Sequence, residues 1–150
     1  MEALQKPIES NARLYLPHLE NLCRAGISGF PSPAQDHEGR RLDLNEFFVS
    51  RPSASFYITA VGDSMREYGI FDGTLLLVDR SLDLAVDDVV VGVVDGELIV
   101  KSYEIRHGRK MLCSGADRYP PVPAEAVEDD TWGVVSSIHR RMRVCRRVSR

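Results

Sequence analysis

Short apolar runs rich in β-branched and aromatic residues dominate the pattern from residue 55 onward. Several of the runs begin or end at glycine or aspartate, as at Gly62, Asp72-Gly73 and Asp95-Gly96, which is typical of strands joined by turns. The predicted strands are residues 56–61, 75–78, 89–94, 97–105, 110–113 and 132–143, and a proline-rich loop around Pro120, Pro121 and Pro123 is predicted between the last two. Asp95-Gly96 separates two of these runs and favours a two-residue hairpin turn. The pattern therefore predicts a mainly β chain in which residues 89–94 pair with residues 97–105.

The first fifty residues have a different pattern. Leucines at irregular helical spacing are interrupted by Pro17, which predicts an arm with at most one or two helical turns. Residues 26–33 are rich in glycine and proline and should form an extended, exposed segment that a protease cleft can reach. A short helix is predicted to begin after Asp43, a capping residue with Glu46 three positions later. Arg51-Pro52 should end this helix.

A lysine interrupts the apolar pattern of the run at residues 97–105. The two-residue period of a strand places Lys101 on one face with Ile99, Tyr103 and Ile105. Such a strand would bury this face, and burying an ammonium group usually lowers its pKa and leaves a neutral amine, which is a base. The alternative is a lysine at a sheet edge, or one whose stem is covered while its charge reaches water.

Ser64 follows the first strand-like run, in Gly62-Asp63-Ser64-Met65. A serine activated by a desolvated lysine is a known nucleophile and base pair. A helical turn after Ser64 would leave the backbone amides of Asp63 and Ser64 free to stabilise a developing oxyanion. A serine in an ordinary turn is the alternative interpretation.

Composition indicates one soluble domain with a short arm. The chain has 150 residues, of which 43% are hydrophobic and 27% charged. Three widely spaced cysteines and four scattered histidines predict neither a disulfide framework nor a metal site, and no cofactor motif occurs. The N-terminus lacks the pattern of a signal peptide, and the longest apolar run, residues 89–94, is too short to cross a bilayer. These features predict a cytoplasmic protein without a membrane anchor.

The net charge of −3 conceals a strong asymmetry. Six arginines and no acidic residue follow His139, so the other 13 basic and 22 acidic side chains give the body a charge of −9 and the tail one of +6. Such a tail can contact nucleic acid or an acidic partner, or it can be a solvated chain end. Direct DNA contact is left open, because no aromatic residue is interleaved to stack on bases.

Several common hydrolase motifs are missing from the sequence. Ser-x-x-Lys does not occur, and Gly62-Asp63-Ser64-Met65-Arg66 lacks the final glycine of Gly-x-Ser-x-Gly. Phosphate-binding glycine loops, Cys-x-x-Cys and His-Glu-x-x-His are also missing. The serine and lysine thus do not match the other peptidase and esterase patterns.

The combined motifs resemble the UmuD branch of the LexA-type self-cleaving serine peptidases, from about Gly29 to Met142. The matching pieces are Gly29-Phe30-Pro31-Ser32-Pro33-Ala34, Leu42-Asp43-Leu44-Asn45, Pro52-Ser53-Ala54, Gly62-Asp63-Ser64-Met65, and Val94-Asp95-Gly96-Glu97 leading to Val100-Lys101. The resemblance implies a β-rich peptidase domain like those of LexA and signal peptidase, with an extended N-terminal arm. The arginine-rich tail is longer and more basic than is usual in this family.

The resemblance also implies roles for individual residues. Ser64 matches the nucleophile and Lys101 the general base, and the amides of Asp63 and Ser64 would bind the oxyanion. The bond cut would be Ser28–Gly29, which divides the chain into an arm of residues 1–28 and a peptidase and dimerisation domain of residues 29–150. Serine before the cut is a departure from the cysteine or alanine of relatives, and Ala25–Gly26 is a second small–small bond that would compete.

The partners that the resemblance implies belong to the SOS response. A RecA filament on single-stranded DNA would stimulate the cut, within one chain or between subunits. The product would form a homodimer and join a UmuC-type translesion polymerase in error-prone synthesis. Two alternatives stay open: a LexA-like or phage-type repressor peptidase, and a polymerase-binding module that is not cut. We expect no repressor, because the 28 residues before Gly29 lack two good helices for a DNA-binding domain.

Overall fold

The computed structural model describes residues 13–17, 41–115, 118–126 and 133–142. The chain divides into two compact units, residues 1–50 and residues 51–150. The sequence predicts a different boundary, at the Ser28–Gly29 bond, because that boundary is where the chain would be cut and not where packing changes. This boundary stays a prediction.

In the first unit, two very short strands pair and a short helix follows. Strand β1 (Leu16–Pro17) lies antiparallel to β2 (Arg41–Leu42), so the described part of the arm is extended where helical turns were predicted. Helix α1 (Leu44–Phe48) has Asp43 as its N-cap, whose side chain accepts from two amides of the first turn. This confirms the predicted helix start. The helix ends at Phe48, earlier than predicted, and a 3-10 turn, η1 (Pro52–Ala54), begins the second unit.

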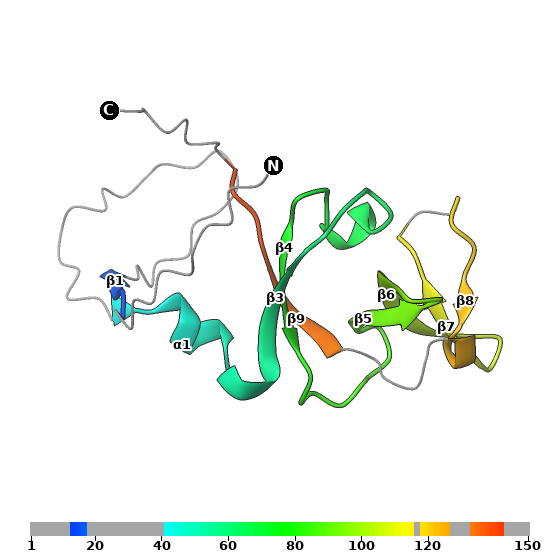
Figure 1. The fold of residues 1–150 in the computed structure, drawn as a ribbon, viewed down its shortest axis with the longest axis horizontal. Coiled ribbons are helices and arrows are strands. Elements are labelled where there is room, and N and C mark those ends of the chain that lie inside the picture. The colour runs from blue at the N-terminus through cyan, green and yellow to red at the C-terminus, as the bar shows by residue number, and fades with distance from the viewer. Residues whose placement is uncertain (1–12, 18–40, 116–117, 127–132, 143–150) are drawn as a thin grey trace, which may run out of the picture. The chain divides into compact units, whose positions relative to one another are not determined.

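The second unit is built around one antiparallel sheet, which confirms the mainly β prediction. Its strands are β3 (Ser55–Thr59), β4 (Leu75–Asp79), β5 (Val89–Val94), β6 (Glu97–Arg106), β7 (Arg109–Cys113), β8 (Val122–Pro123) and β9 (Gly133–His139). Their order across the sheet is β3-β4-β9-β5-β6-β7-β8. Figure 1 shows β3, β4 and β9 together, with the β5–β6 hairpin and then β7 and β8 beyond them. The late strand β9 therefore joins the earlier strands into one sheet.

Glycine turns set the register of the β5–β6 hairpin. Asp95 and Gly96 both have positive φ, 51° and 78°, the conformation of a two-residue hairpin turn, so the predicted hairpin is confirmed. Val94 pairs with Glu97, and this register places Lys101 opposite the buried Val90. A second turn of the same kind, at His107 and Gly108, joins β6 to β7. The lysine is thus held in the interior of the sheet by turn chemistry that is visible in the sequence.

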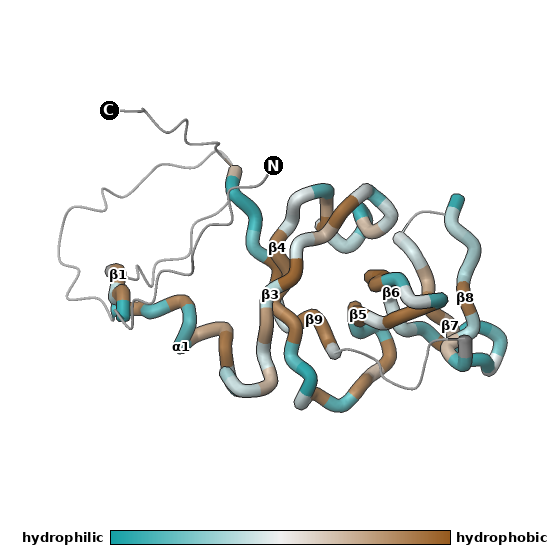
Figure 2. The backbone as a smooth tube through the Cα atoms, in the orientation of Figure 1, coloured by the Kyte–Doolittle hydropathy of each residue, from teal (hydrophilic) through white to brown (hydrophobic). Residues whose placement is uncertain are grey.

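Hydrophobic side chains form two clusters in the second unit. The first contains Ala60, Met65, Ile70, Leu76, Val78 and Val91, and the second contains Val90, Tyr103, Leu112 and Val134. Figure 2 shows strongly hydrophobic positions on β4, β5 and β9 and also on β3 and β6. Met65, which is only 2% exposed, belongs to the first cluster. The residue after Ser64 is therefore a packing anchor.

Three sequence predictions need correction here. Ile105 is 54% exposed, because the predicted apolar face of β6 is buried at Tyr103 but leaves the core near the β6–β7 turn. Pro123 belongs to an edge strand, β8, where a proline-rich loop was predicted; an edge position tolerates proline because no sheet hydrogen bond from its nitrogen is needed. Strand β9 ends at His139, before residue 143.

Among the described residues, no helix has the length and apolar character needed to cross a membrane.

Candidate active site

Ser64 lies in a tight turn that leads from β3 into a 3-10 helix, η2 (Arg66–Tyr68). Gly62 starts this turn with a φ of +85°, which favours glycine, and its amide donates to Asp72 Oδ1 at 2.8 Å. Met65 anchors the turn, since its carbonyl accepts from the amides of Tyr68 and Ile70 while its side chain is buried. The sequence thus fixes the backbone on both sides of the serine hydroxyl.

The two amides predicted to bind an oxyanion lie in this same turn. Asp63 and Ser64 are both half-buried. Neither amide donates to an acceptor within the described part of the chain. Unsatisfied amides next to a serine hydroxyl can stabilise a negatively charged oxygen without reorganising first.

Lys101 lies in the middle of β6 and is half-buried. Its Nζ donates to Ser114 Oγ, and it lies 5.7 Å from the centre of the Tyr119 ring. Burial lowers the pKa of the Lys101 ammonium group from its ordinary value, and a negative charge on Cys113 would act in the opposite direction. The lysine is therefore closer to being a neutral base than an exposed lysine would be.

Ser64 and Lys101 line one cavity of about 480 Å³. The cavity is formed by the turn after β3 and by β6, and its apolar lining includes Ile58, Val61 and Val100. Val61 is 89% exposed, so the rim of the cavity also presents an apolar side chain to solvent. The structure brings the predicted nucleophile and base into one cleft, across 37 positions of sequence.

The segment after β7 supports the Ser64 turn from the other side. The Gly115 amide donates to the Ser64 carbonyl oxygen at 2.9 Å. A Cβ added at Gly115 would lie 3.2 Å from Glu67 Cβ and 3.2 Å from Tyr68 Cδ2, tighter than ordinary contact. Ser114 and Gly115 were not predicted as site residues, and a Ser-Gly pair at the end of a strand gives only a weak signal in the sequence.

Gly115→Ala is expected to slow self-cleavage about 10-fold. The added methyl group should displace η2 by a few tenths of an ångström, and this displacement should also move Ser64. The cleavage rate should be measured by intact mass beside a thermal melt. Gly73→Ala is the matched control, because a Cβ there meets no atom within 4 Å although its φ of +77° is strained. Equal cleavage rates for the two variants would show that the Gly115 contact does not position Ser64.

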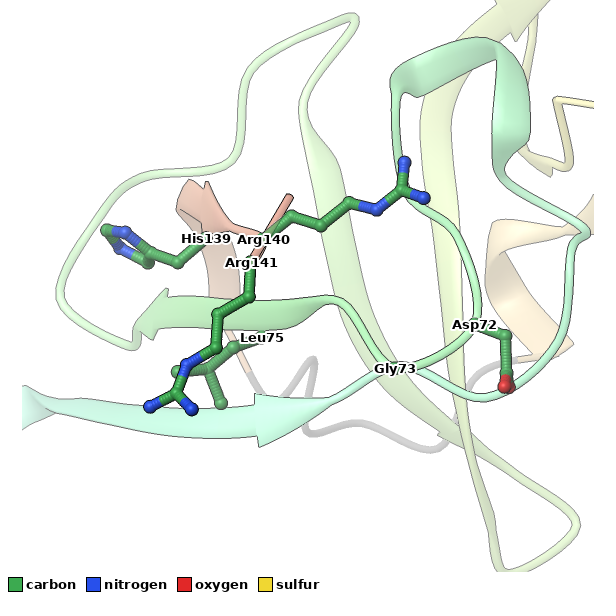
Figure 3. A pocket seen from close by; sticks show the side chains of 6 residues that line it. All are labelled: Asp72, Gly73, Leu75, His139, Arg140 and Arg141. Carbon is green, nitrogen blue, oxygen red and sulfur yellow. The ribbon is translucent and has the colours of Figure 1, made fainter. Parts of the chain in front are cut away.

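A second cavity, of about 520 Å³, has more basic side chains in its lining than the first, but these side chains are not arranged for catalysis. It is lined by Asp72, Gly73, Leu75, His139, Arg140 and Arg141. Figure 3 shows that the two arginine side chains and the histidine point away from one another. The Arg140 guanidinium lies 4.4 Å from the centre of the Phe71 ring. The basic groups do not converge on a common ligand position.

Several predicted features lie outside the described residues. These are the Ser28–Gly29 bond, the competing Ala25–Gly26 bond and the tail after Met142. Among the described residues, no group of three or more His, Cys, Asp or Glu side chains could hold a metal ion.

Comparison with known proteins identifies the family. Residues 22–136 match the Peptidase S24-like family, and the chain belongs to it. Protein SamA of Salmonella typhimurium is 36% identical over 137 residues, which cover 91% of each chain. Protein MucA of Escherichia coli is 38% identical over 112 residues, covering 73% of this chain and 75% of MucA. The LexA repressor of Xylella fastidiosa is 33% identical over 122 residues, covering 81% of this chain and 56% of the repressor.

The particular member type follows from these relatives. SamA and MucA are UmuD-like proteins, which confirms the resemblance drawn from the sequence motifs. Family and relatives together support a self-cleaving serine peptidase of the SOS response with an accessory function for a polymerase.

Proposed function

We propose that Ser64 and Lys101 form the catalytic dyad, and that this dyad cuts the Ser28–Gly29 bond of the same protein. The observation that carries the proposal is the shared cavity: a serine and a lysine of lowered pKa line the same cleft, and the amides of Asp63 and Ser64 donate to no acceptor among the described residues. Nucleophile, base and oxyanion donors are the three parts that acyl transfer needs.

The acylation step balances with these groups alone. The neutral Lys101 Nζ takes the proton from Ser64 Oγ as this oxygen attacks the carbonyl carbon of Ser28. The Asp63 and Ser64 amides donate to the oxyanion of the tetrahedral intermediate. When the bond to Gly29 breaks, the Lys101 ammonium returns the proton to the departing amine. An ester between Ser28 and Ser64 remains.

Water completes the reaction. Lys101, neutral again, removes a proton from a water molecule, which attacks the ester carbon. The intermediate collapses to the carboxylic acid of Ser28, which loses its proton to solvent, and to Ser64 Oγ, which recovers its proton from Lys101. Because enzyme and substrate are one polypeptide or two subunits of a dimer, the effective concentration of the scissile bond is high. Regulation then acts on whether this bond lies in the cleft.

The apolar rim of the cavity suits the residues around the proposed cut. Small residues on both sides of the Ser28–Gly29 bond let the backbone approach Ser64 closely. Phe30 follows the bond in the sequence, and an apolar side chain there suits a cleft with an apolar lining.

The partners and the location belong to the same proposal. A RecA filament on single-stranded DNA would favour the population in which the arm occupies the cleft. The product, residues 29–150, would act in the cytoplasm as a homodimer that joins a UmuC-type translesion polymerase.

Intact mass spectrometry of the purified chain tests the cut. At alkaline pH, or with RecA, ATP and single-stranded DNA, we expect loss of residues 1–28 and a new terminus at Gly29. A new terminus at Gly26 would move the cut to the competing bond. A chain that stays whole under both conditions would contradict the proposal and favour a binding module that is not cut.

A further inference from the structure

The hydroxyl group of Ser114 lies next to the amine of the proposed base. Lys101 Nζ donates to Ser114 Oγ, and Ser114 is half-buried. The neighbouring residue, Gly115, donates its amide to the Ser64 carbonyl oxygen at 2.9 Å. Two consecutive residues therefore touch the base through one side chain and the nucleophile through one amide.

The sheet register explains why the serine reaches the lysine. Ser102 of β6 pairs with Cys113 of β7. The next opposed positions in this antiparallel register are Lys101 and Ser114, and side chains of directly opposed residues lie on the same face of a sheet. Ser114 is the first residue after β7, so the contact agrees with this register extended by one position.

Two groups then restrict the directions open to the amine. Ser114 Oγ accepts one N–H of Lys101, and the Tyr119 ring centre lies 5.7 Å from the same nitrogen. A neutral amine that donates to Ser114 keeps its lone pair for another partner. An ammonium formed during the reaction keeps the same acceptor, and the bond becomes charge-assisted and stronger.

We infer that Ser114 is a positioning residue of the self-cleavage reaction: its hydroxyl oxygen orients Lys101 Nζ so that the amine faces Ser64 in the cleft. The inference rests on the proposed function of Ser64 and Lys101. The side chain of Ser114 bonds to Lys101, so it acts through the lysine. It also supplies an acceptor for the ammonium that exists between proton removal and proton return.

The test is the rate of self-cleavage as a function of pH, followed by intact mass, for wild type, Ser114→Ala and Ser114→Thr. Ser114→Ala is expected to cut about 10- to 100-fold more slowly on the high-pH plateau, because the amine is no longer held. Its midpoint should move to lower pH, since the ammonium loses an acceptor and its pKa falls. Ser114→Thr keeps the hydroxyl and should restore both values to near wild type.

Controls separate this inference from the proposed function. Ser136→Ala removes a β9 hydroxyl that donates to the Leu77 carbonyl oxygen at 3.3 Å and does not line the cleft, so this variant should cut like wild type. If Ser64→Ala is uncut while Ser114→Ala matches wild type in rate and midpoint, the dyad stands and the inference is wrong. A slower Ser114→Ala with an unchanged midpoint and no rescue by threonine would also overturn it. That result would mean that Ser114 supports the fold and does not act on the Lys101 amine. If the wild-type protein is never cut, the proposed function is wrong, and the inference that rests on it is wrong as well.

Two further measurements guard against ambiguous results. If Ser114→Ala unfolds at the assay temperature, Ser114→Val replaces it, because valine has nearly the shape of threonine but no hydroxyl group and should give the same slow rate and lowered midpoint. A fluorophosphonate probe, which reacts with activated serines, is expected to label Ser64. Labelling of Ser114 instead would make it the nucleophile and would overturn the positioning role.

Discussion

Replacing either Lys101 or Ser64 with alanine is expected to leave the chain uncut at every pH. Without Lys101, no described group lining the cavity replaces the amine as a base, and a general base contributes about 10²- to 10⁴-fold in rate. Without Ser64 Oγ, no ester can form. Intact mass after prolonged incubation at alkaline pH measures both losses against wild type.

The wild type should show the titration of Lys101 in its pH profile. The neutral amine is the active form, so the rate of self-cleavage rises with pH and levels off above the pKa of the folded protein. Burial lowers the pKa of Lys101, so the midpoint should lie below the value of about 10.4 found for free lysine. A midpoint at or above that value would show that burial does not tune this amine.

Two matched variants sharpen this prediction. Lys101→Arg keeps the positive charge and much of the length but cannot lose its proton, so it should be as inactive as Lys101→Ala. Lys110→Ala removes an exposed lysine from β7 and should cut like wild type. Self-cleavage by Lys101→Arg, or by Ser64→Ala, would remove these residues from the dyad.

The parts of the site that local chemistry dictates could be predicted from the sequence. Asp95-Gly96 demanded positive φ at two successive residues, and this fixed the register that places Lys101 opposite Val90. The motif Gly62-Asp63-Ser64-Met65 identified the nucleophile, and in the structure its glycine supplies a positive φ while its methionine is buried. In both cases the residue types of a short motif carried the information.

The support of the site by Ser114 and Gly115 could not be predicted, because it depends on tertiary pairing. Ser114 gains its significance only when β7 lies beside β6 in the observed register. The exposure of Ile105 was missed for the related reason that period two identifies a face but not where that face leaves the core. The pairing of β8 with β7 was missed because prolines usually indicate a loop. They are tolerated in a strand at the edge of a sheet, and the sequence does not show which strand lies at the edge.

Gly133→Ala is expected to be among the most destabilising single methyl additions in the second unit. A Cβ at this position would lie 2.8 Å from Val78 Cγ1 and 3.0 Å from the Asp79 carbonyl oxygen. The second contact is with backbone of β4, which is paired to β9 and cannot rotate away as a flexible side chain would. We expect a loss of about 3 kcal/mol in the free energy of unfolding, near the upper end for an overpacked core.

Denaturant and thermal melts measure this loss, with Gly108→Ala as the matched control. Gly108 has a φ of +74° but nothing within 4 Å of an added Cβ, so only backbone strain of about 1 kcal/mol is expected there. At about 2–4 °C per kcal/mol, the Gly133 variant should melt about 10 °C lower than wild type. Equal losses for the two variants would mean that β4 and β9 are not as close as they are here. Because β9 also pairs with β5 through Val91, which lines the cleft, a Gly133→Ala protein that stays folded should also cut more slowly.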